Sequence, residues 1–355
     1  KEETEEFIAN YVFSKRNIEK YCNINLKSLL PSGGKSDINA YDWIRIARKK
    51  AVIDYYAAKA NIRVNTGFVD VEFEKFILDG YKNLSGEVNR DAPIIIPKVL
   101  DFIIASGKSA LIVIDGMSLF DFEVMSRYLE GIEYEYHCTY AMIPTTTAIS
   151  RQCLLSGKYP RELKNQFDLS QEEKEFVEAA KLRGYTKKQC LYAMGYDPPI
   201  NPFTKLAVII INDIDDLVHG QKQGRLGMYN DITVWARSGK LQVLIRNLNE
   251  QGFNIYITSD HGNTPCTGIG IIRNTGVEVE TKSKRMIVLK DFAEEKEYFE
   301  GKVIYYPGYY LDKDYKYYVC EPGVSFDNKN KEVMTHGGIS IDEVIVPFIK
   351  VKAVR

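Results

Sequence analysis

Apolar and polar residues alternate in two different ways along the chain. In residues 41–60 and 71–84, apolar side chains recur three and four positions apart, as on one face of a helix. Beyond residue 107, short apolar runs end in acidic or glycine-containing loops and are separated by amphipathic stretches. The pattern therefore predicts a helical region over residues 1–106 and an α/β domain over residues 107–355.

The second part of the chain is expected to alternate strands with helices. Strands are predicted at 109–114, 134–143, 190–195, 206–211, 253–257 and 344–351, and helices at 118–129, 145–155 and 228–250. This alternation predicts a mostly parallel sheet with helices on both faces, a three-layer α/β/α sandwich. A polar helical stretch near 160–188 and a tyrosine-rich stretch near 265–333 interrupt the pattern, and we interpret both as insertions.

The composition is that of a soluble globular protein. The chain has 355 residues, of which 45% are hydrophobic and 27% charged, and its net charge of −1 implies no bulk attraction to nucleic acid. No apolar run approaches the ~20 residues of a membrane span, and no signal peptide opens the sequence. Because the sequence opens on Lys1 and not on Met, we expect it to have been trimmed from a longer chain.

Six cysteines are scattered along the chain without a Cys-x-x-Cys pair. They predict reduced, mostly buried thiols in a cytoplasmic protein, and they argue against a zinc–thiolate site. The histidines carry more information, because only four are present and three of them stand in loops rich in Asp or Gly.

Three local patterns have an ordinary interpretation that we prefer. Residues 32–36 read Ser-Gly-Gly-Lys-Ser but lack the spacing and the preceding strand of a phosphate-binding loop. The basic run 282–285 could contact phosphates, although a solvated surface turn explains it more simply. The tyrosines between 305 and 318 could stack nucleobases, but an antiparallel subdomain with half-buried phenol rings explains them better.

The strongest chemical signal lies in residues 255–264. An apolar run there ends in Ser259, Asp260, His261 and Gly262, so a carboxylate and an imidazole stand where a strand gives way to a loop. Ligands of open α/β sheets bind at this carboxyl edge. Asp260 and His261 are therefore the first candidates for metal binding.

Other expected strand ends carry the same kinds of side chain. Asp115 follows the first strand, Asp215 and His219 follow the strand at 206–211, and His336 precedes a glycine pair. Taken alone, each has an ordinary explanation as a turn, helix-end or loop residue. Together, mixed carboxylate and imidazole ligands suit Zn²⁺ or Mn²⁺, and two such ions ~4 Å apart can stabilise both the attacking and the leaving oxygen of a phosphoryl transfer.

A candidate nucleophile lies in the threonine cluster 145–147. The cluster is expected where a strand gives way to a helix, and the helix N-terminus would favour a bound phosphate. A threonine hydroxyl is a weak nucleophile until a metal ion lowers its pKa. Simple N-capping by one of these threonines is the alternative interpretation.

The order of these motifs resembles that of the alkaline phosphatase superfamily. The motifs are Asp115-Gly116, Pro144-Thr145-Thr146-Thr147, Ser156-Gly157-Lys158-Tyr159-Pro160, Asp215 with His219, Asp260-His261-Gly262 and Thr335-His336-Gly337-Gly338. Residues 150–160 and 335–348 in particular resemble PglZ domains, which occur in BREX-type phage-defence proteins and as effectors of some response regulators. The resemblance covers about residues 108–352 and leaves residues 1–106 outside it.

The resemblance implies an alkaline phosphatase-like fold and a centre with two divalent ions, Zn²⁺ in the first instance and Mn²⁺ as the alternative. One ion would be bound by Asp115, Thr147, Asp260 and His261, and the other by Asp215, His219 and His336. Thr147 is preferred as the nucleophile because the reactive threonine of related nucleotide pyrophosphatases is the second of a Pro-Thr-x-Thr run. Asp213 is the alternative to Asp215, and Arg151 is expected either to hold a phosphate oxygen or to form an exposed helix salt bridge.

The activity that the resemblance implies is that of a metal-dependent phosphodiesterase acting on nucleotides or oligonucleotides, with proteins of a defence complex as partners. Thr147 would attack phosphorus, and water would then release the phospho- or nucleotidyl-threonine. A catalytically silent scaffold of a defence complex and a phosphomonoesterase are the alternatives. A sulfatase is disfavoured because Cys153 lacks the Cys-x-Pro-x-Arg setting of those enzymes.

Overall fold

The computed structural model describes residues 13–31, 38–271, 278–279, 283–290 and 302–352. The α-helices are α2 (Lys15–Lys27), α3 (Ala40–Lys59), α4 (Phe68–Asp79), α5 (Val99–Ile104), α6 (Leu119–Met125), α7 (Thr147–Ser156), α8 (Glu172–Leu182), α9 (Asp213–Gly220), α10 (Gly224–Arg237), α11 (Lys240–Glu250) and α12 (Ile341–Val344). The strands are β1 (Ser109–Ile114), β2 (Tyr134–Tyr140), β3 (Cys190–Met194), β4 (Leu206–Ile211), β5 (Asn254–Thr258), β6 (Thr264–Gly268), β7 (Glu278–Val279), β8 (Met286–Lys290), β9 (Val303–Tyr306), β10 (Tyr315–Cys320), β11 (Val324–Ser325), β12 (Glu332–Thr335) and β13 (Ile345–Val351). The glycine-containing stretch 32–36 and Lys282 lie outside the described residues.

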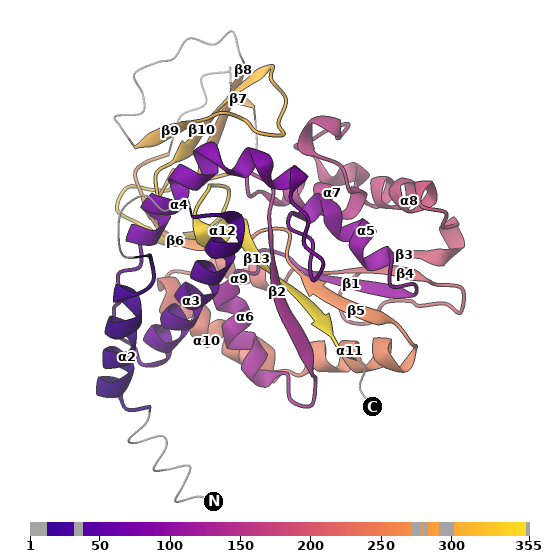
Figure 1. Ribbon diagram of the computed structural model, residues 1–355, viewed down its shortest axis with the longest axis horizontal. Coiled ribbons are helices and arrows are strands. Elements are labelled where there is room, and N and C mark those ends of the chain that lie inside the picture. The colour runs from indigo at the N-terminus through magenta and orange to yellow at the C-terminus, as the bar shows by residue number, and fades with distance from the viewer. Residues whose placement is uncertain (1–12, 32–37, 272–277, 280–282, 291–301, 353–355) are drawn as a thin grey trace, which may run out of the picture.

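A six-stranded sheet forms the centre of the molecule (Figure 1). Its strand order is β2-β13-β5-β1-β4-β3. Strands β5, β1, β4 and β3 pair in parallel, whereas β13 runs antiparallel to both of its neighbours. The predicted mostly parallel sheet is confirmed. Because β1 lies between β5 and β4, the loops that follow these three strands meet at one edge of the sheet.

Helices cover both faces of this sheet, as predicted (Figure 1). Alternate residues of β1 point to opposite sides. Leu111 and Val113 pack with α5, α7 and α8, while Ile112 and Ile114 pack with α6, α9, α10 and α11. Every residue of the strand is buried. Burial on both faces explains why the sequence of β1 is a continuous apolar run and not an alternating one.

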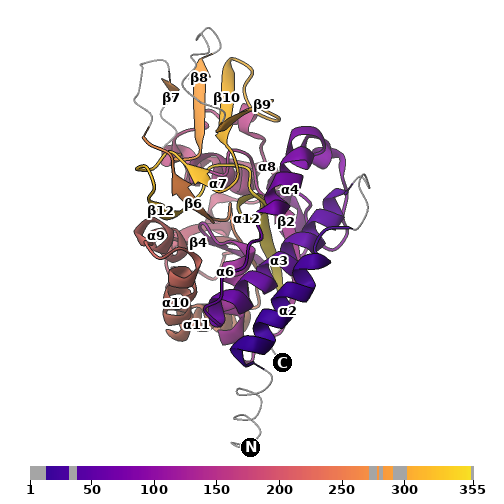
Figure 2. The ribbon, with the colours of Figure 1, turned by 90° about the vertical axis from the view of Figure 1, so that its left-hand side faces the viewer.

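The N-terminal helices pack directly on this α/β body, and Figure 2 shows α3 alongside α6. Tyr55 and Ala58 of α3 belong to the apolar cluster that contains α6 and α10. Trp43 of α3 contacts Phe73 of α4, with ring centroids 5.0 Å apart. The helical character of the N-terminal region is confirmed, whereas a domain boundary at residue 106 stays a prediction.

Two smaller sheets occupy the tyrosine-rich stretch. One has the order β7-β8-β10-β9 with antiparallel pairing, and the other has the order β11-β6-β12. Tyr306 and Tyr317 are buried in this part of the molecule, and Tyr305 is exposed. The tyrosines therefore build an antiparallel subdomain, which is the interpretation preferred above. That 265–333 and 160–188 are insertions stays a prediction.

Three elements are shorter than the sequence pattern predicts. The helix expected over 118–129 is α6, which ends at Met125. The helix expected over 228–250 is two helices, α10 and α11, which are separated at Ser238 and Gly239. Gly239 has a φ of 72°, in the left-handed region that ends helices. The strand expected over 134–143 ends at Tyr140.

Among the described helices, none combines the length and the apolar character that crossing a membrane requires. All six cysteines are free thiols, and each is buried except Cys190, which is partly exposed. The cytoplasmic location stays a prediction.

Candidate metal centre

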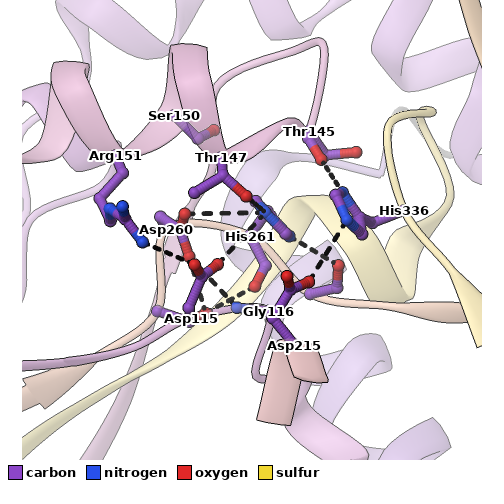
Figure 3. A network of polar contacts seen from close by, with 12 residues as sticks. Asp115, Gly116, Thr145, Thr147, Ser150, Arg151, Asp215, Asp260, His261 and His336 are labelled. Carbon is purple, nitrogen blue, oxygen red and sulfur yellow. Dashed lines mark hydrogen bonds and ion pairs between the residues drawn. The ribbon is translucent and has the colours of Figure 1, made fainter. Parts of the chain in front are cut away.

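Carboxylate and imidazole side chains meet at the carboxyl edge of the central sheet (Figure 3). Asp115 follows β1, Asp260 and His261 follow β5, Asp215 lies in the first turn of α9 directly after β4, and His336 follows β12. Within the described residues they form two groups, Asp115 with Asp260 and His261, and Asp215 with His219 and His336. The candidate ligand atoms of each group lie within 4.8 Å of one another.

The first group is buried. Nε2 of His261 lies 3.6 Å from Oδ1 of Asp115 and 3.6 Å from Oδ2 of Asp260. The opposite oxygens are engaged inside the protein, since Oδ2 of Asp115 accepts a hydrogen bond of 2.6 Å from Arg151, and Oδ1 of Asp260 accepts one of 3.3 Å from the Gly116 amide. The two oxygens that face His261 have no hydrogen-bond partner in the described structure. Each carboxylate thus uses one oxygen for support and presents the other.

The second group is more open to solvent. Oδ2 of Asp215 lies 3.2 Å from Nε2 of His219, and Oδ1 lies 3.4 Å from Nε2 of His336. His219 follows Asp215 by one turn of α9, so both side chains lie on the same face of that helix. The side chain of His219 is 52% exposed, against 10% for His336. A substrate or a water molecule can therefore reach this half of the centre.

Backbone carbonyls fix the orientation of both buried imidazoles. Nδ1 of His261 lies 3.1 Å from the Gly262 carbonyl, and Nδ1 of His336 lies 3.0 Å from the Thr145 carbonyl. Because a carbonyl only accepts, Nδ1 of each ring donates, and Nε2 of the neutral ring keeps its lone pair. The two rings stack with centroids 4.2 Å apart. The two groups therefore form one continuous centre.

Thr147 is the threonine that reaches this centre (Figure 3). It is the first residue of α7, and its Oγ1 lies 3.1 Å from Nε2 of His261. The hydroxyl of Thr145 accepts a hydrogen bond from the Gly337 amide instead, and Thr146, at the N-cap position, makes no side-chain cap bond. N-capping by a threonine hydroxyl, the alternative interpretation of this cluster, does not occur at α7.

Burial dominates the electrostatics of the first group. Burial, together with the charge of Asp260, raises the pKa of Asp115 to about 8. Burial also raises the pKa of Asp260 to about 6, and burial beside His336 lowers the pKa of His261 to about 4. These shifts keep a proton on Asp115 and leave the His261 ring neutral at pH 7.

The second group shows the opposite balance. Burial would raise the pKa of Asp215, but hydrogen bonds from His219 and His336 outweigh it and hold that pKa well below its usual range. Burial would lower the pKa of His336, but the hydrogen bond and charge of Asp215 raise it to about 9. Asp215 and His336 therefore form an ion pair at neutral pH.

The donors of this centre fit divalent cations. Oδ1 of Asp115 and Oδ2 of Asp260 are buried acceptors without a partner in the described structure, and leaving such atoms unpaired is costly. Carboxylate oxygens and neutral imidazole nitrogens are ligands of Zn²⁺ and Mn²⁺. A cation here would supply the missing partner and reverse the rise in the pKa of Asp115.

Gly116 allows the two groups to approach each other. Its φ is 72°, in the left-handed region that glycine adopts without strain. A Cβ at this position would lie 3.3 Å from Oδ1 of Asp215. The Asp115-Gly116 turn is therefore needed for the close packing of β1 against the start of α9.

One of the two expectations for Arg151 is wrong. The residue is only 5% exposed, so it forms no exposed helix salt bridge. Its Nη1 donates to Asp115 at 2.6 Å and its Nε donates to Glu172 at 2.9 Å, so these two donors face carboxylates. That Arg151 holds a phosphate oxygen stays a prediction.

Two further sequence expectations concern residues near the centre. Asp213, the alternative to Asp215, belongs to neither group of candidate ligands in the described part of the chain. Arg285 of the basic run is fully buried and forms an ion pair with Glu343. The interpretation of that run as a solvated turn is therefore wrong at Arg285.

Glu172 and Tyr192 also support this centre, and neither is predicted from the sequence pattern. Glu172 begins α8, is buried, and accepts hydrogen bonds from Arg151 and from the Tyr192 hydroxyl at 2.6 Å. The polar composition of 160–188 suggests a solvated helix. Phe176, which is buried one turn after Glu172, is the signal that could have placed the glutamate on the inner face.

Several solved structures resemble the chain at low sequence identity. Murine ectonucleotide pyrophosphatase/phosphodiesterase 5 is 13% identical with a TM-score of 0.45, and the match covers 68% of this chain and 88% of that chain. For the human protein of the same name the identity is 14% and the TM-score 0.44, with 68% and 87% covered. Phosphonoacetate hydrolase from Sinorhizobium meliloti 1021, in complex with phosphonoformate, is 11% identical with a TM-score of 0.42, and 68% and 89% are covered. No curated protein matches the chain.

The match to a protein family is more extensive. The BREX system PglZ alkaline phosphatase-like domain matches residues 98–351. This range contains the central sheet, α7 and both groups of candidate ligands. The resemblance carried by the ordered motifs is confirmed, and the chain belongs to the PglZ family of alkaline phosphatase-like domains.

Proposed function

We propose that this chain is a metal-dependent phosphoric ester hydrolase that cleaves phosphodiesters of nucleotides or oligonucleotides with Thr147 as its nucleophile. One observation carries the proposal. The Thr147 hydroxyl lies 3.1 Å from Nε2 of His261, at the start of α7 and beside two groups of carboxylate and imidazole donors. Membership of an alkaline phosphatase-like family supports the same reaction class.

The candidate centre would hold two divalent ions, Zn²⁺ in the first instance and Mn²⁺ as the alternative. The residues that would hold them are Asp115, Thr147, Asp260 and His261 for one ion, and Asp215, His219 and His336 for the other. When bound, such ions lower the pKa of a hydroxyl group or a water molecule and offset the charge of the phosphate.

The chain itself would position the reacting groups. Oγ1 of Thr147 would lose its proton, attack phosphorus in line and form a new bond as the ester oxygen leaves with its electron pair and takes up a proton. The N-terminal end of α7 would place partial positive charge beside the phosphate. Water would then attack the phospho- or nucleotidyl-threonine, the bond between phosphorus and Oγ1 would break, and the hydroxyl of Thr147 would regain its proton.

The choice of a nucleotide substrate, and of defence proteins as partners in the cytoplasm, rests on the BREX system named for this family. The basic run gives it no support in its described part. Lys284 lies 3.1 Å from Asp327, and Arg285 is paired with Glu343. We therefore expect substrate recognition to depend mainly on groups at the centre itself.

The test compares a diester with a monoester. Wild-type protein loaded with Zn²⁺ or Mn²⁺ is expected to hydrolyse bis-p-nitrophenyl phosphate faster than p-nitrophenyl phosphate. Thr147→Ala should lose roughly 10³-fold or more of this activity, as removal of a nucleophile does, while Thr147→Ser keeps part of it. Thr146→Ser is the matched control, because that hydroxyl makes no cap bond. Equal inactivity of wild type and Thr147→Ala on both substrates would favour the scaffold, and faster cleavage of the monoester would indicate a phosphomonoesterase.

A further inference from the structure

We propose that Arg151, held in place by Glu172, is a positioning residue that orients Asp115 for cation binding. This inference rests on the proposed function, because it concerns the same centre. It assigns a role to a buried arginine that touches neither the Thr147 hydroxyl nor the second group of candidate ligands in any described contact.

Arg151 joins two buried carboxylates from separate parts of the chain. Its Nη1 lies 2.6 Å from Oδ2 of Asp115, and its Nε lies 2.9 Å and 3.1 Å from the two oxygens of Glu172. The relative exposures of the three side chains are only 6%, 5% and 3% for Arg151, Asp115 and Glu172. Hydrogen bonds from a charged guanidinium this well buried are weakly screened, so their geometry is tightly defined.

The bond from Arg151 decides which oxygen Asp115 presents. The terminal torsion of an aspartate is broad and roughly two-fold, so an unsupported carboxylate turns easily. With Oδ2 held by the guanidinium, Oδ1 faces Nε2 of His261 at 3.6 Å and has no hydrogen-bond partner in the described structure. Figure 3 shows Arg151 on one side of Asp115 and the imidazole of His261 on the other. Arg151 therefore selects the oxygen that would bind the cation.

Glu172 gives the guanidinium its own fixed position. The carboxylate also accepts a hydrogen bond of 2.6 Å from the hydroxyl of Tyr192 on β3. Glu172 further balances the charge of Arg151, which would otherwise stand next to a dication and weaken its binding. The segment 160–188 thus contributes a supporting residue to the centre.

Helix α7 connects this support to the nucleophile. Thr147 and Arg151 are four residues apart on α7, so they lie on one face of the helix. Thr147 lies within 3.1 Å of His261, and Arg151 binds Asp115 on the neighbouring strand end. The arginine therefore fixes the distance between the helix that carries the hydroxyl and the carboxylate that would bind the cation.

The fork of the guanidinium is the property that this role requires. An ammonium group would keep the charge, but it cannot offer the planar Nη1 and Nε donors that bridge Asp115 and Glu172. Lysine at this position should therefore fail to replace arginine. If charge alone mattered, lysine would be sufficient.

Zinc affinity at this half of the centre provides the test. His219→Ala is used as the background, so that the Asp115 group is the one left to be measured. Zinc is titrated into the chelator-treated 355-residue chain against a chromogenic competitor. Arg151→Met, Arg151→Lys and Glu172→Gln are each expected to raise the zinc Kd by roughly 10- to 100-fold, the usual effect of losing a residue that supports a metal ligand. Arg183→Met, which removes an arginine paired with Asp101 away from the centre, should leave it unchanged.

The outcomes separate the two hypotheses. Failure of the wild-type chain to bind zinc contradicts the proposed function. If the wild-type chain binds two zinc ions and the folded Arg151 variants bind zinc as tightly as their His219→Ala background, the role of Arg151 is contradicted and the proposed function is not. The same conclusion holds if Arg151→Lys keeps the zinc affinity of that background. Should Arg151→Met not fold, as judged by its thermal transition, Glu172→Gln decides, because it removes the charge and one acceptor but leaves one acceptor oxygen for Nε of Arg151.

Discussion

Nζ of Lys50 lies 2.7 Å from the carboxylate of Asp342, although 292 residues separate them in the sequence. The same ammonium binds Asp54 at 2.9 Å, and Asp342 also accepts a hydrogen bond from Arg225. The side chains of Lys50 and Asp342 are 1% and 9% exposed. This ion cluster ties the N-terminal helix α3 to α12, the helix that precedes strand β13 of the central sheet.

Lys50→Met is expected to destabilise the protein by about 3 kcal/mol, because it removes the ammonium shared by the buried carboxylates of Asp54 and Asp342 and leaves them with Arg225. Urea denaturation followed by circular dichroism would measure the change. Lys75→Met is the matched control, since Lys75 forms an exposed ion pair with Glu72 and should change the free energy of unfolding by less than about 0.5 kcal/mol. A loss below about 1 kcal/mol in Lys50→Met would show that α3 is not fastened to the α/β body in this way.

Asp342 also contacts the loop that carries His261. Gly262 donates a backbone hydrogen bond of 2.9 Å to the Glu343 carbonyl, and a Cβ on Gly262 would lie 2.0 Å from the Asp342 carbonyl oxygen. It would also lie 3.1 Å from Cα of Ser118. These neighbours are backbone atoms, which cannot rotate away.

Gly262→Ala is therefore expected to cost about 1–3 kcal/mol or more and to displace His261, with a loss of zinc affinity. Gly86→Ala, where a new Cβ meets nothing within 4 Å, is the control that should retain both properties. Thermal denaturation and zinc titration of the two variants would be compared. Normal stability and zinc binding in Gly262→Ala would mean that the loop can move away from Asp342.

The sequence was informative where a local pattern determines the structure. Strand β4 was predicted at its observed bounds, because a six-residue apolar run followed by Asn212 and Asp213 leaves little freedom. The candidate ligands could be named for the same reason, since each follows an expected strand or precedes a glycine pair. That these side chains bind metal ions stays a prediction.

The remaining features depend on packing between distant segments. Lys50 on α3 and Glu172 on α8 are buried charges, and charged residues are normally assigned to the surface. Their partners, Asp342 and Arg151, lie 292 and 21 residues away, beyond any helical or strand period. No periodicity connects such pairs, so only the folded structure identifies them.

The two groups of candidate ligands predict separable metal sites. His336→Ala removes one of the three candidate donors of the group formed by Asp215, His219 and His336, and should reduce the tightly bound zinc from two ions per chain to one. His137→Ala is the control, because His137 lies on β2 and belongs to neither group. Metal analysis after gel filtration would give the stoichiometry. Two zinc ions in His336→Ala would place the second ion elsewhere.

The stability of the metal-free protein should depend on pH in a defined window. Asp115 and His336 have pKa values of about 8 and about 9, above their ordinary values of 3.8 and 6.5. The folded protein therefore binds more protons than the unfolded chain between pH 6.5 and 8. The stabilisation that these bound protons give the folded state is complete below the ordinary pKa values of the two groups. It is lost as the pH rises through about 8 for Asp115 and about 9 for His336. His261, with a lowered pKa of about 4, acts in the opposite direction but only below pH 6.5.

Zinc should remove this dependence, because a bound carboxylate or imidazole nitrogen has no proton left to lose. As the pH rises from 6.5 to 9, the melting temperature of chelator-treated protein is expected to fall. The melting temperature of zinc-loaded protein should fall less, so the increase in melting temperature caused by zinc grows with pH. Differential scanning fluorimetry at three pH values would measure both. Asp115→Asn, which cannot ionise, should show a smaller growth of the shift than the wild type. A zinc-induced shift that is the same at pH 6.5 and pH 9 would mean that protons and zinc do not compete for Asp115 and His336.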